Sequence, residues 1–168
     1  MRVGPTLEQL KKDYNNEIKV VFKNLIVHPG TATIPALASC AANLQGKFEP
    51  MYDLIWEKGF NAGRNLSQDN MEKLAGELGL NMSKFKADME GDCKKIVEQE
   101  QSEMRAVGAR GTPAFFINGR FLSGAQPIEN FKAIIDDELK KANDRIAKGT
   151  SVENYYEEWV MKKGKKTL

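Results

Sequence analysis

Cysteine and histidine are scarce in this chain of 168 residues, which has two cysteines and one histidine. Cys40 and Cys93 lie far apart in the sequence, so they form neither a zinc-finger spacing nor a Cys-x-x-Cys motif. His28 stands alone, so any Ser-His or Cys-His catalysis would depend on that one side chain. The residues alone therefore show no complete active site, and no metal or other cofactor is expected.

The chain also lacks an excess of either charge and lacks long apolar runs. Its 25 basic and 23 acidic residues give a net charge of +2, which argues against a nucleic-acid partner. No apolar run reaches the ~18 residues that a membrane span needs. The first residues have no apolar core of a signal peptide, so the sequence as written carries no export signal. With 41% hydrophobic and 29% charged residues, the composition is that of a globular protein.

Apolar residues recur at helical spacing in several stretches that begin and end at helix-capping or helix-breaking residues. The predicted helices span residues 5–14, 33–58 with a break near Gly46 or Pro50, 67–79, 85–104 with an interruption near Gly91, and a stretch from Pro127 to Ile146. A capping box at residues 150–153 predicts a last helix that carries Tyr155, Tyr156 and Trp159. Those rings attach this helix either to the rest of the chain or to a neighbouring chain.

Strands are predicted in two places. Residues 19–27 contain a β-branched run typical of a strand that is buried on both faces. Residues 114–117 and 120–122 flank Asn118-Gly119, which is the strongest hairpin signal in the chain. The order of helix, strand, helical block, strand, hairpin strand and helix indicates an α/β fold.

The segment from Gly111 to Arg120 reads Gly-Thr-Pro-Ala-Phe-Phe-Ile-Asn-Gly-Arg and is followed by Gly-Ala-Gln-Pro at 124–127. It resembles the C-terminal half of the DsbA-like thioredoxin-fold oxidoreductases, and residues 5–10, 20–23 and 45–48 match the same family in the same order. The resemblance covers roughly residues 2–140. It implies a thioredoxin-like domain of the DsbA type over residues 1–148, with a helical insertion at about 31–108. Residues 149–168 would form a C-terminal helix and a basic tail.

One departure from the family concerns its catalytic motif. Members carry Cys-x-x-Cys at the start of the first helix, and alignment on Pro5 places the second cysteine immediately before Met1. The family's first sheet strand also falls upstream. The resemblance therefore implies a truncated chain that lacks this strand and the cysteine pair, so no catalytic residue is assigned and the chain as it stands is expected to be inactive. Sheet edges left open by the missing strand predict a homo-oligomer.

The cysteines and the histidine that are present have structural interpretations. Cys40 lies in an Ala-rich stretch and is expected to be a small buried hydrophobe, whereas Cys93 lies among charged residues and is expected to be an exposed or half-exposed free thiol. A disulfide between them would close a long loop and add up to ~4 kcal/mol, but the sequence does not show that the two residues approach each other. His28 is expected to make local hydrogen bonds in a turn. Four aromatic residues are expected in the core: Phe48, Trp56, Phe115 and Phe116.

The resemblance assigns a substrate-binding role to Thr112 and Pro113. The family's matching proline is cis and faces the cysteine pair, which implies that the backbone of Thr112 turns outward to pair with an extended polypeptide. The implied activity is disulfide exchange on extracytoplasmic polypeptides, together with a redox partner protein, in the periplasm or cell envelope. Two alternatives stay open: a redox-inactive peptide-binding module of the thioredoxin type, and a relative of the glutathione-dependent isomerases and transferases.

Overall fold

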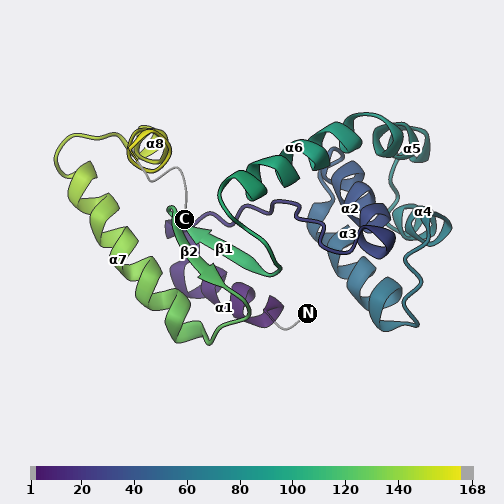
Figure 1. Ribbon diagram of the computed structural model, residues 1–168, viewed down its shortest axis with the longest axis horizontal. Coiled ribbons are helices and arrows are strands. Elements are labelled where there is room, and N and C mark those ends of the chain that lie inside the picture. The colour runs from purple at the N-terminus through teal and green to yellow at the C-terminus, as the bar shows by residue number, and fades with distance from the viewer. Residues whose placement is uncertain (1–2, 164–168) are drawn as a thin grey trace. The chain divides into compact units, whose positions relative to one another are not determined.

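The computed structural model describes residues 3–163, most of which are helical. The chain divides into two compact units, which are described separately (Figure 1). Residues 23–105 form the helical unit. Residues up to Phe22 and from Ala106 onward form the hairpin unit, which contains the one sheet found among the described residues. None of the helices in the described part of the chain combines the length and the apolar composition that a membrane span requires.

The helical unit is a sequence of short helices separated by helix-breaking residues. Its elements are α2 (Pro29–Asn43), α3 (Phe48–Leu54), the π-helical continuation η2 (Ile55–Asn61), α4 (Gln68–Glu77), α5 (Met82–Glu90) and α6 (Asp92–Ala106). The break after α2 falls at Gly46, which adopts a positive φ of 71° that glycine tolerates. Pro50 lies in the first turn of α3, where its missing N–H costs no hydrogen bond, so it does not break the helix. Gly91 separates α5 from α6, as the sequence predicts.

A disulfide between Cys40 and Cys93 joins α2 to α6 inside the core of the helical unit. The two residues are 6% and 0% exposed, so the expectation of an exposed free thiol at Cys93 is wrong. The reason is geometric, because consecutive residues on a helix point in different directions. Cys93 shares its face of α6 with buried Val97, whereas its charged sequence neighbours point away from the core.

Residues 19–27 do not form the predicted strand. They have no regular secondary structure, with a bend at Val27, and Val20, Val21 and Phe22 are 46%, 62% and 44% exposed. A β-branched run favours an extended backbone but forms a strand only beside another strand, and the described residues place none there. Where this segment enters the helical unit it is anchored by Asn24, whose backbone N–H and side-chain amide both donate to the Glu100 carboxylate at 3.0 and 2.7 Å.

The hairpin unit contains β1 (Ala114–Ile117) and β2 (Arg120–Ser123), which pair antiparallel with Phe116 opposite Phe121. Asn118 and Gly119 both have positive φ values, 46° and 87°, which is the two-residue turn that the sequence predicts. The other elements up to residue 146 are α1 (Gly4–Tyr14), the short 3-10 helix η1 (Asn15–Glu17) and α7 (Ile128–Ile146). Their core consists of Val3, Leu10, Tyr14, Phe131 and Ile135.

The last helix also belongs to the hairpin unit and consists of α8 (Val152–Tyr155) and the π-helical segment η3 (Tyr156–Lys162). Ser151 caps it by accepting the N–H of Asn154 at 3.2 Å, so the cap lies one residue after the start of the predicted capping box. Trp159 donates its indole N–H to the Thr150 hydroxyl at 3.2 Å, and the Arg145 guanidinium of α7 lies 3.8 Å from its ring centroid. Trp159 therefore attaches this helix to its own chain.

Candidate functional site

The Thr112–Pro113 loop leads directly into β1, and its peptide bond is cis. The carbonyl of Pro113 accepts the N–H of Gly124 at 2.9 Å, which continues the ladder one step beyond the Ala114–Ser123 pair. The C-terminal side of the loop is therefore held to β2 by backbone hydrogen bonds. Gly124 has a φ of 78°, a value that favours glycine at this position.

Thr112 lies on the free side of this loop. The residue is exposed, and within residues 3–163 neither its N–H nor its C=O has a hydrogen-bond partner. β1 has β2 as its one strand neighbour in the same part of the chain, so the edge of β1 away from β2 is also open. Backbone donors and acceptors in such positions are the groups through which an extended peptide adds to a sheet. Thr112 and Pro113, the two predicted site residues, thus adjoin an open strand edge.

The hairpin rests on α7 through an apolar and an ionic contact. The ring of Phe115 packs edge-to-face on Phe131 with centroids 4.9 Å apart. On β2, Arg120 pairs with Asp137 and approaches the buried Glu138 at 3.5 Å, while Lys141 lies 2.8 Å from Glu138. Because Glu138 has two cations beside it, its burial is compensated by charge. The Phe115 ring therefore holds the hairpin on α7 near the Thr112–Pro113 loop, whereas the Arg120 ion pairs hold its turn end.

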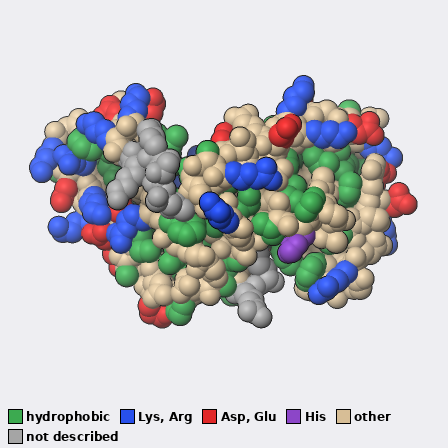
Figure 2. Space-filling model, in the orientation of Figure 1, with side chains coloured by type: hydrophobic (Ala, Val, Ile, Leu, Met, Phe, Trp, Pro, Cys, Tyr) green, Lys and Arg blue, Asp and Glu red, His purple; other side chains and the backbone are tan. Residues whose placement is uncertain are grey.

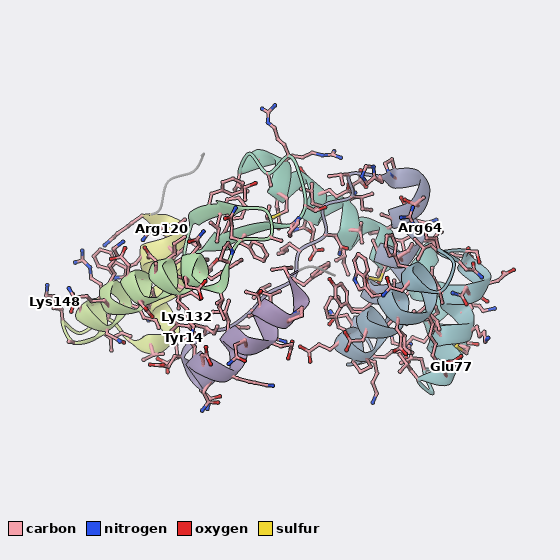
Figure 3. The ribbon with its side chains drawn as sticks, turned by 90° about the horizontal axis from the view of Figure 1, so that it is seen from below. Tyr14, Arg64, Glu77, Arg120, Lys132 and Lys148 are labelled. Carbon is pink, nitrogen blue, oxygen red and sulfur yellow. A yellow bond between two sulfur atoms is a disulfide. The ribbon has the colours of Figure 1, made fainter. Side chains whose placement is uncertain are left out.

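Helix α1 is attached to α7 by polar pairs at its C-terminal end (Figure 3 labels Tyr14 and Lys132). The Tyr14 hydroxyl donates to Asp136, and Lys132 lies 2.6 Å from Asp13. Burial, and then the hydrogen bond to Asp136, raise the pKa of Tyr14 to about 12. The hydrogen bond from Lys132 lowers the pKa of Asp13. These pairs hold α1 against α7, the helix on which the hairpin packs.

The other residues singled out in the sequence do not join this site. Cys40 and Cys93 are bonded to each other and buried in the helical unit, so neither presents a thiol. His28 lies on the surface (Figure 2, purple) and precedes α2, where its carbonyl accepts the N–H of Ala32 at 2.9 Å. Among residues 3–163 there is no group of His, Cys, Asp and Glu side chains that could hold a metal ion.

The helical unit has two surface hollows that periodicity in the sequence did not indicate. One, of about 240 Å³, lies between α2 and α6 and is lined mainly by apolar residues such as Ile26 and Val97. The other, of about 400 Å³, is lined by Met89 and Glu90 among others and shares Lys94 with the first. Nothing in the sequence could have located them, because each is formed by residues that are distant along the chain.

Comparison with known proteins identifies the family. The family model described as a DSBA-like thioredoxin domain matches residues 4–136. The chain belongs to this family of DSBA-like thioredoxin domains. The match starts at Gly4, the first residue of α1, and ends at residue 136, within α7. It therefore includes both the helical unit and the hairpin that follows Thr112 and Pro113.

Curated relatives share a segment of similar length. A protein named Na(+)/H(+) antiporter NhaA from Herminiimonas arsenicoxydans is 31% identical over 130 residues, which are 77% of this chain and 20% of the relative. Na(+)/H(+) antiporter NhaA 1 of Salinispora arenicola is 31% identical over 137 residues, 78% of this chain and 20% of that protein. The chain thus spans about a fifth of the length of these relatives. No solved structure matches the chain.

Proposed function

We propose that this chain is the substrate-binding part of a thiol-disulfide oxidoreductase domain that exchanges disulfides with extended polypeptides. Family membership supports the reaction class. The observation that carries the proposal is the exposed Thr112, whose backbone groups have no partner within residues 3–163 and lie beside the open edge of β1. An extended substrate would pair with the backbone of Thr112 as an added strand. This pairing would hold the cysteine sulfur of the substrate at a fixed distance from the Thr112–Pro113 loop.

The chemistry itself needs a dithiol that this sequence does not contain. In the family the Cys-x-x-Cys precedes the segment that aligns with Pro5, and a sheet strand precedes it. In oxidation, a substrate thiolate attacks the enzyme disulfide, forms a mixed disulfide and releases one enzyme thiolate; a second substrate thiolate then displaces the other. Because Cys40 and Cys93 are buried in their own disulfide, this chain is expected to show no insulin reduction above the buffer rate.

Compartment and assembly follow from the same features. A disulfide in the core of the helical unit is typical of proteins that fold outside the cytoplasm, which supports a periplasmic or cell-envelope location for the parent protein. The open edge of β1 supports association between chains by strand pairing. Sedimentation at tens of micromolar that shows only monomer would contradict the association.

A redox-inactive peptide-binding module is the second candidate, because this chain presents no accessible thiol. Such a module would bind extended chains at Thr112 without chemistry. The antiporter relatives suggest a further setting, in which a domain of this kind is part of a larger protein named for transport. Transport itself is not carried over, because the match spans only about a fifth of each relative.

Binding at Thr112 is tested by titrating the 15N-labelled chain with reduced, carboxamidomethylated insulin B chain and following backbone amide shifts. Thr112→Ala keeps the backbone N–H and is expected to bind as the unmodified chain does. Thr112→Pro removes that N–H and is expected to weaken binding about tenfold, as loss of a hydrogen bond worth ~1.4 kcal/mol would. Equal binding by both variants, or shifts that leave residues 112–117 unchanged, would contradict the proposed site.

A further inference from the structure

Arg110 lies two residues before Thr112, in the short segment between the end of α6 at Ala106 and the cis peptide bond. Ala109 is 2% exposed, so the chain is anchored immediately before the arginine. Arg110, Gly111 and Thr112 are all exposed. Apart from its chain neighbours, a Cβ atom placed on Gly111 would meet no heavy atom within 4 Å. The Arg110 side chain therefore emerges from an anchored backbone into open space beside the proposed binding loop.

The structure describes three arginines in the hairpin unit, and two of them have partners inside it. Arg120 forms ion pairs with carboxylates of α7, and Arg145 lies over the ring of Trp159 (Figure 3 labels Arg120). Within residues 3–163, Arg110 has no ion pair, side-chain hydrogen bond or ring contact. A guanidinium carries a permanent positive charge and five N–H donors. At Arg110 these donors are open to an external partner.

The sequence around the loop contains no acidic residue. Residues 104–128 include three arginines and neither Asp nor Glu. Arg105 donates to the neutral side chain of Gln101 at 3.4 Å, whereas the charge of Arg120 is balanced by α7. The uncompensated charge of Arg110 therefore makes the neighbourhood of the loop attractive to anions and repulsive to cations.

An extended peptide bound at Thr112 would pass within reach of Arg110. The N–H groups of Gly111 and Thr112 have no hydrogen-bond partner in the described part of the chain, so backbone donors lie next to the arginine. Cα atoms two residues apart are at most about 7 Å from each other, a distance that an arginine side chain covers. A peptide side chain within two residues of the position paired with Thr112 can therefore contact the guanidinium.

Among peptide side chains, a carboxylate matches this cation best. Asp and Glu accept two parallel N–H···O bonds from one guanidinium, and these bonds are charge-assisted and geometrically specific. Asn and Gln offer a single neutral acceptor, whereas Lys and Arg are repelled by the like charge. The segment of polypeptide that this loop favours is therefore an acidic one.

We propose that Arg110 is a specificity-determining residue, which selects substrate segments with Asp or Glu within two residues of the position paired with Thr112. This inference rests on the proposed function and names the class of substrate that the domain prefers. The substrate backbone pairs with Thr112, while the guanidinium of Arg110 holds its carboxylate. Arg110 thus acts on affinity and determines which segment is presented for disulfide exchange.

The test titrates the 15N-labelled chain with three capped peptides, acetyl-(Thr-Asp)3-amide and its Asn and Lys counterparts, and follows the backbone amides of residues 110–112. The caps remove the terminal charges, and the repeat places an acidic residue near Thr112 in every register. We expect the Asp peptide to bind about threefold to fivefold more tightly than the Asn peptide, which is the size of an exposed ion pair. The Lys peptide should bind most weakly.

Arg110→Gln is expected to make the affinities for the Asp and Asn peptides equal, and Arg110→Lys to keep part of the difference, because lysine retains the charge but not the planar fork. Both variants alter an exposed side chain, so the urea midpoint should not change. The matched control is Lys148→Gln, which removes a positive charge from an exposed residue just beyond the C-terminal end of α7 (Figure 3 labels Lys148). It should leave the preference for Asp intact.

Three outcomes overturn the inference: equal affinity of the unmodified chain for the Asp and Asn peptides, a preference for Asp that persists in Arg110→Gln, or an equal loss of that preference in Lys148→Gln. Failure of the proposed function gives a different result, because Thr112→Pro keeps Arg110 and should weaken all three peptides by the same factor. If Thr112→Pro changes no affinity while Arg110→Gln abolishes the preference, the carboxylate site at Arg110 is confirmed and the pairing at Thr112 is rejected.

Discussion

The helical unit and the hairpin unit differ in how their elements are held together. The helical unit has a large apolar core that includes Phe85, Met51 and Met71, and a disulfide crosses it. The hairpin unit has a smaller core, and much of its cohesion comes from polar pairs around α7, such as Tyr14 with Asp136. The groups proposed to bind polypeptide backbone lie on the less deeply packed unit. The helical unit is thus stabilised by its apolar core and its disulfide, whereas the hairpin unit supplies an open strand edge.

The largest effect should come from removing one buried ring in each unit. Phe85 and Phe131 are 0% and 2% exposed, so replacing either with Ala is expected to cost about 4 kcal/mol of unfolding free energy. Phe131→Ala also removes the ring on which Phe115 packs, so it should abolish amide shifts at residues 112–117 during insulin B-chain titration. Phe85→Ala should destabilise the helical unit and leave those shifts intact. Urea unfolding combined with the titration measures both, and identical effects of the two variants would remove the distinction between the units.

A slightly smaller effect is expected from deleting the disulfide. The double variant C40A/C93A is expected to lose about 3 kcal/mol, because the bond closes a long loop between α2 and α6. Hydrogen exchange should show reduced protection in α2 and α6 and unchanged protection in β1, β2 and α7. The conservative control is Ser39→Ala, which removes a buried hydroxyl beside Cys40 that donates to the Ala36 carbonyl of its own helix. Uniform loss of protection in both units would show that they unfold as one.

The smallest effect concerns the pH dependence of the hairpin unit. The pKa of Tyr14 is raised to about 12 from an ordinary value near 10, so the folded state retains this proton longer than the unfolded state does. The contribution is fully present below about pH 10 and is lost as pH rises through about 12. Absorbance at 295 nm should show a late-titrating tyrosinate that Tyr14→Phe removes. If the titration curves of the two proteins differ only near pH 10, Tyr14 is not protected as described.

Some local features of the fold could be predicted from the sequence, because a few consecutive residues determine the backbone conformation of a turn, a helix cap or a helix break. The Asn118-Gly119 turn, the Ser67 cap of α4 and the break at Gly91 all occur where the residues indicate. Each depends on φ values or capping hydrogen bonds available to a few consecutive residues, so distant partners matter little. The hairpin that carries the candidate site was predictable for the same reason.

Features that depend on distant partners were not predictable in the same way. The β-branched segment at residues 19–27 reads as a buried strand, yet it has no regular secondary structure, because no described strand lies beside it. Cys93 reads as an exposed thiol, yet helix packing turns it toward Cys40. The role of Thr112 and Pro113 came from resemblance to a family, since no local pattern distinguishes a binding loop from an ordinary turn.

The amino-acid sequence by itself determined the break at Gly91, the turn of the hairpin and the family to which the chain belongs, because these depend on neighbouring residues and on a continuous motif. It misplaced the starts of α2 and α5, which begin at Pro29 and Met82 rather than at residues 33 and 85. Only the tertiary structure decided that two remote cysteines meet, that Thr112 lies beside an open strand edge, and that Phe48 and Trp56, predicted core residues, are half-buried and lie outside the core cluster of the helical unit. Whether a side chain is buried or a strand is paired depends both on the segment itself and on the distant segment that contacts it. The local sequence describes only the first of these two segments.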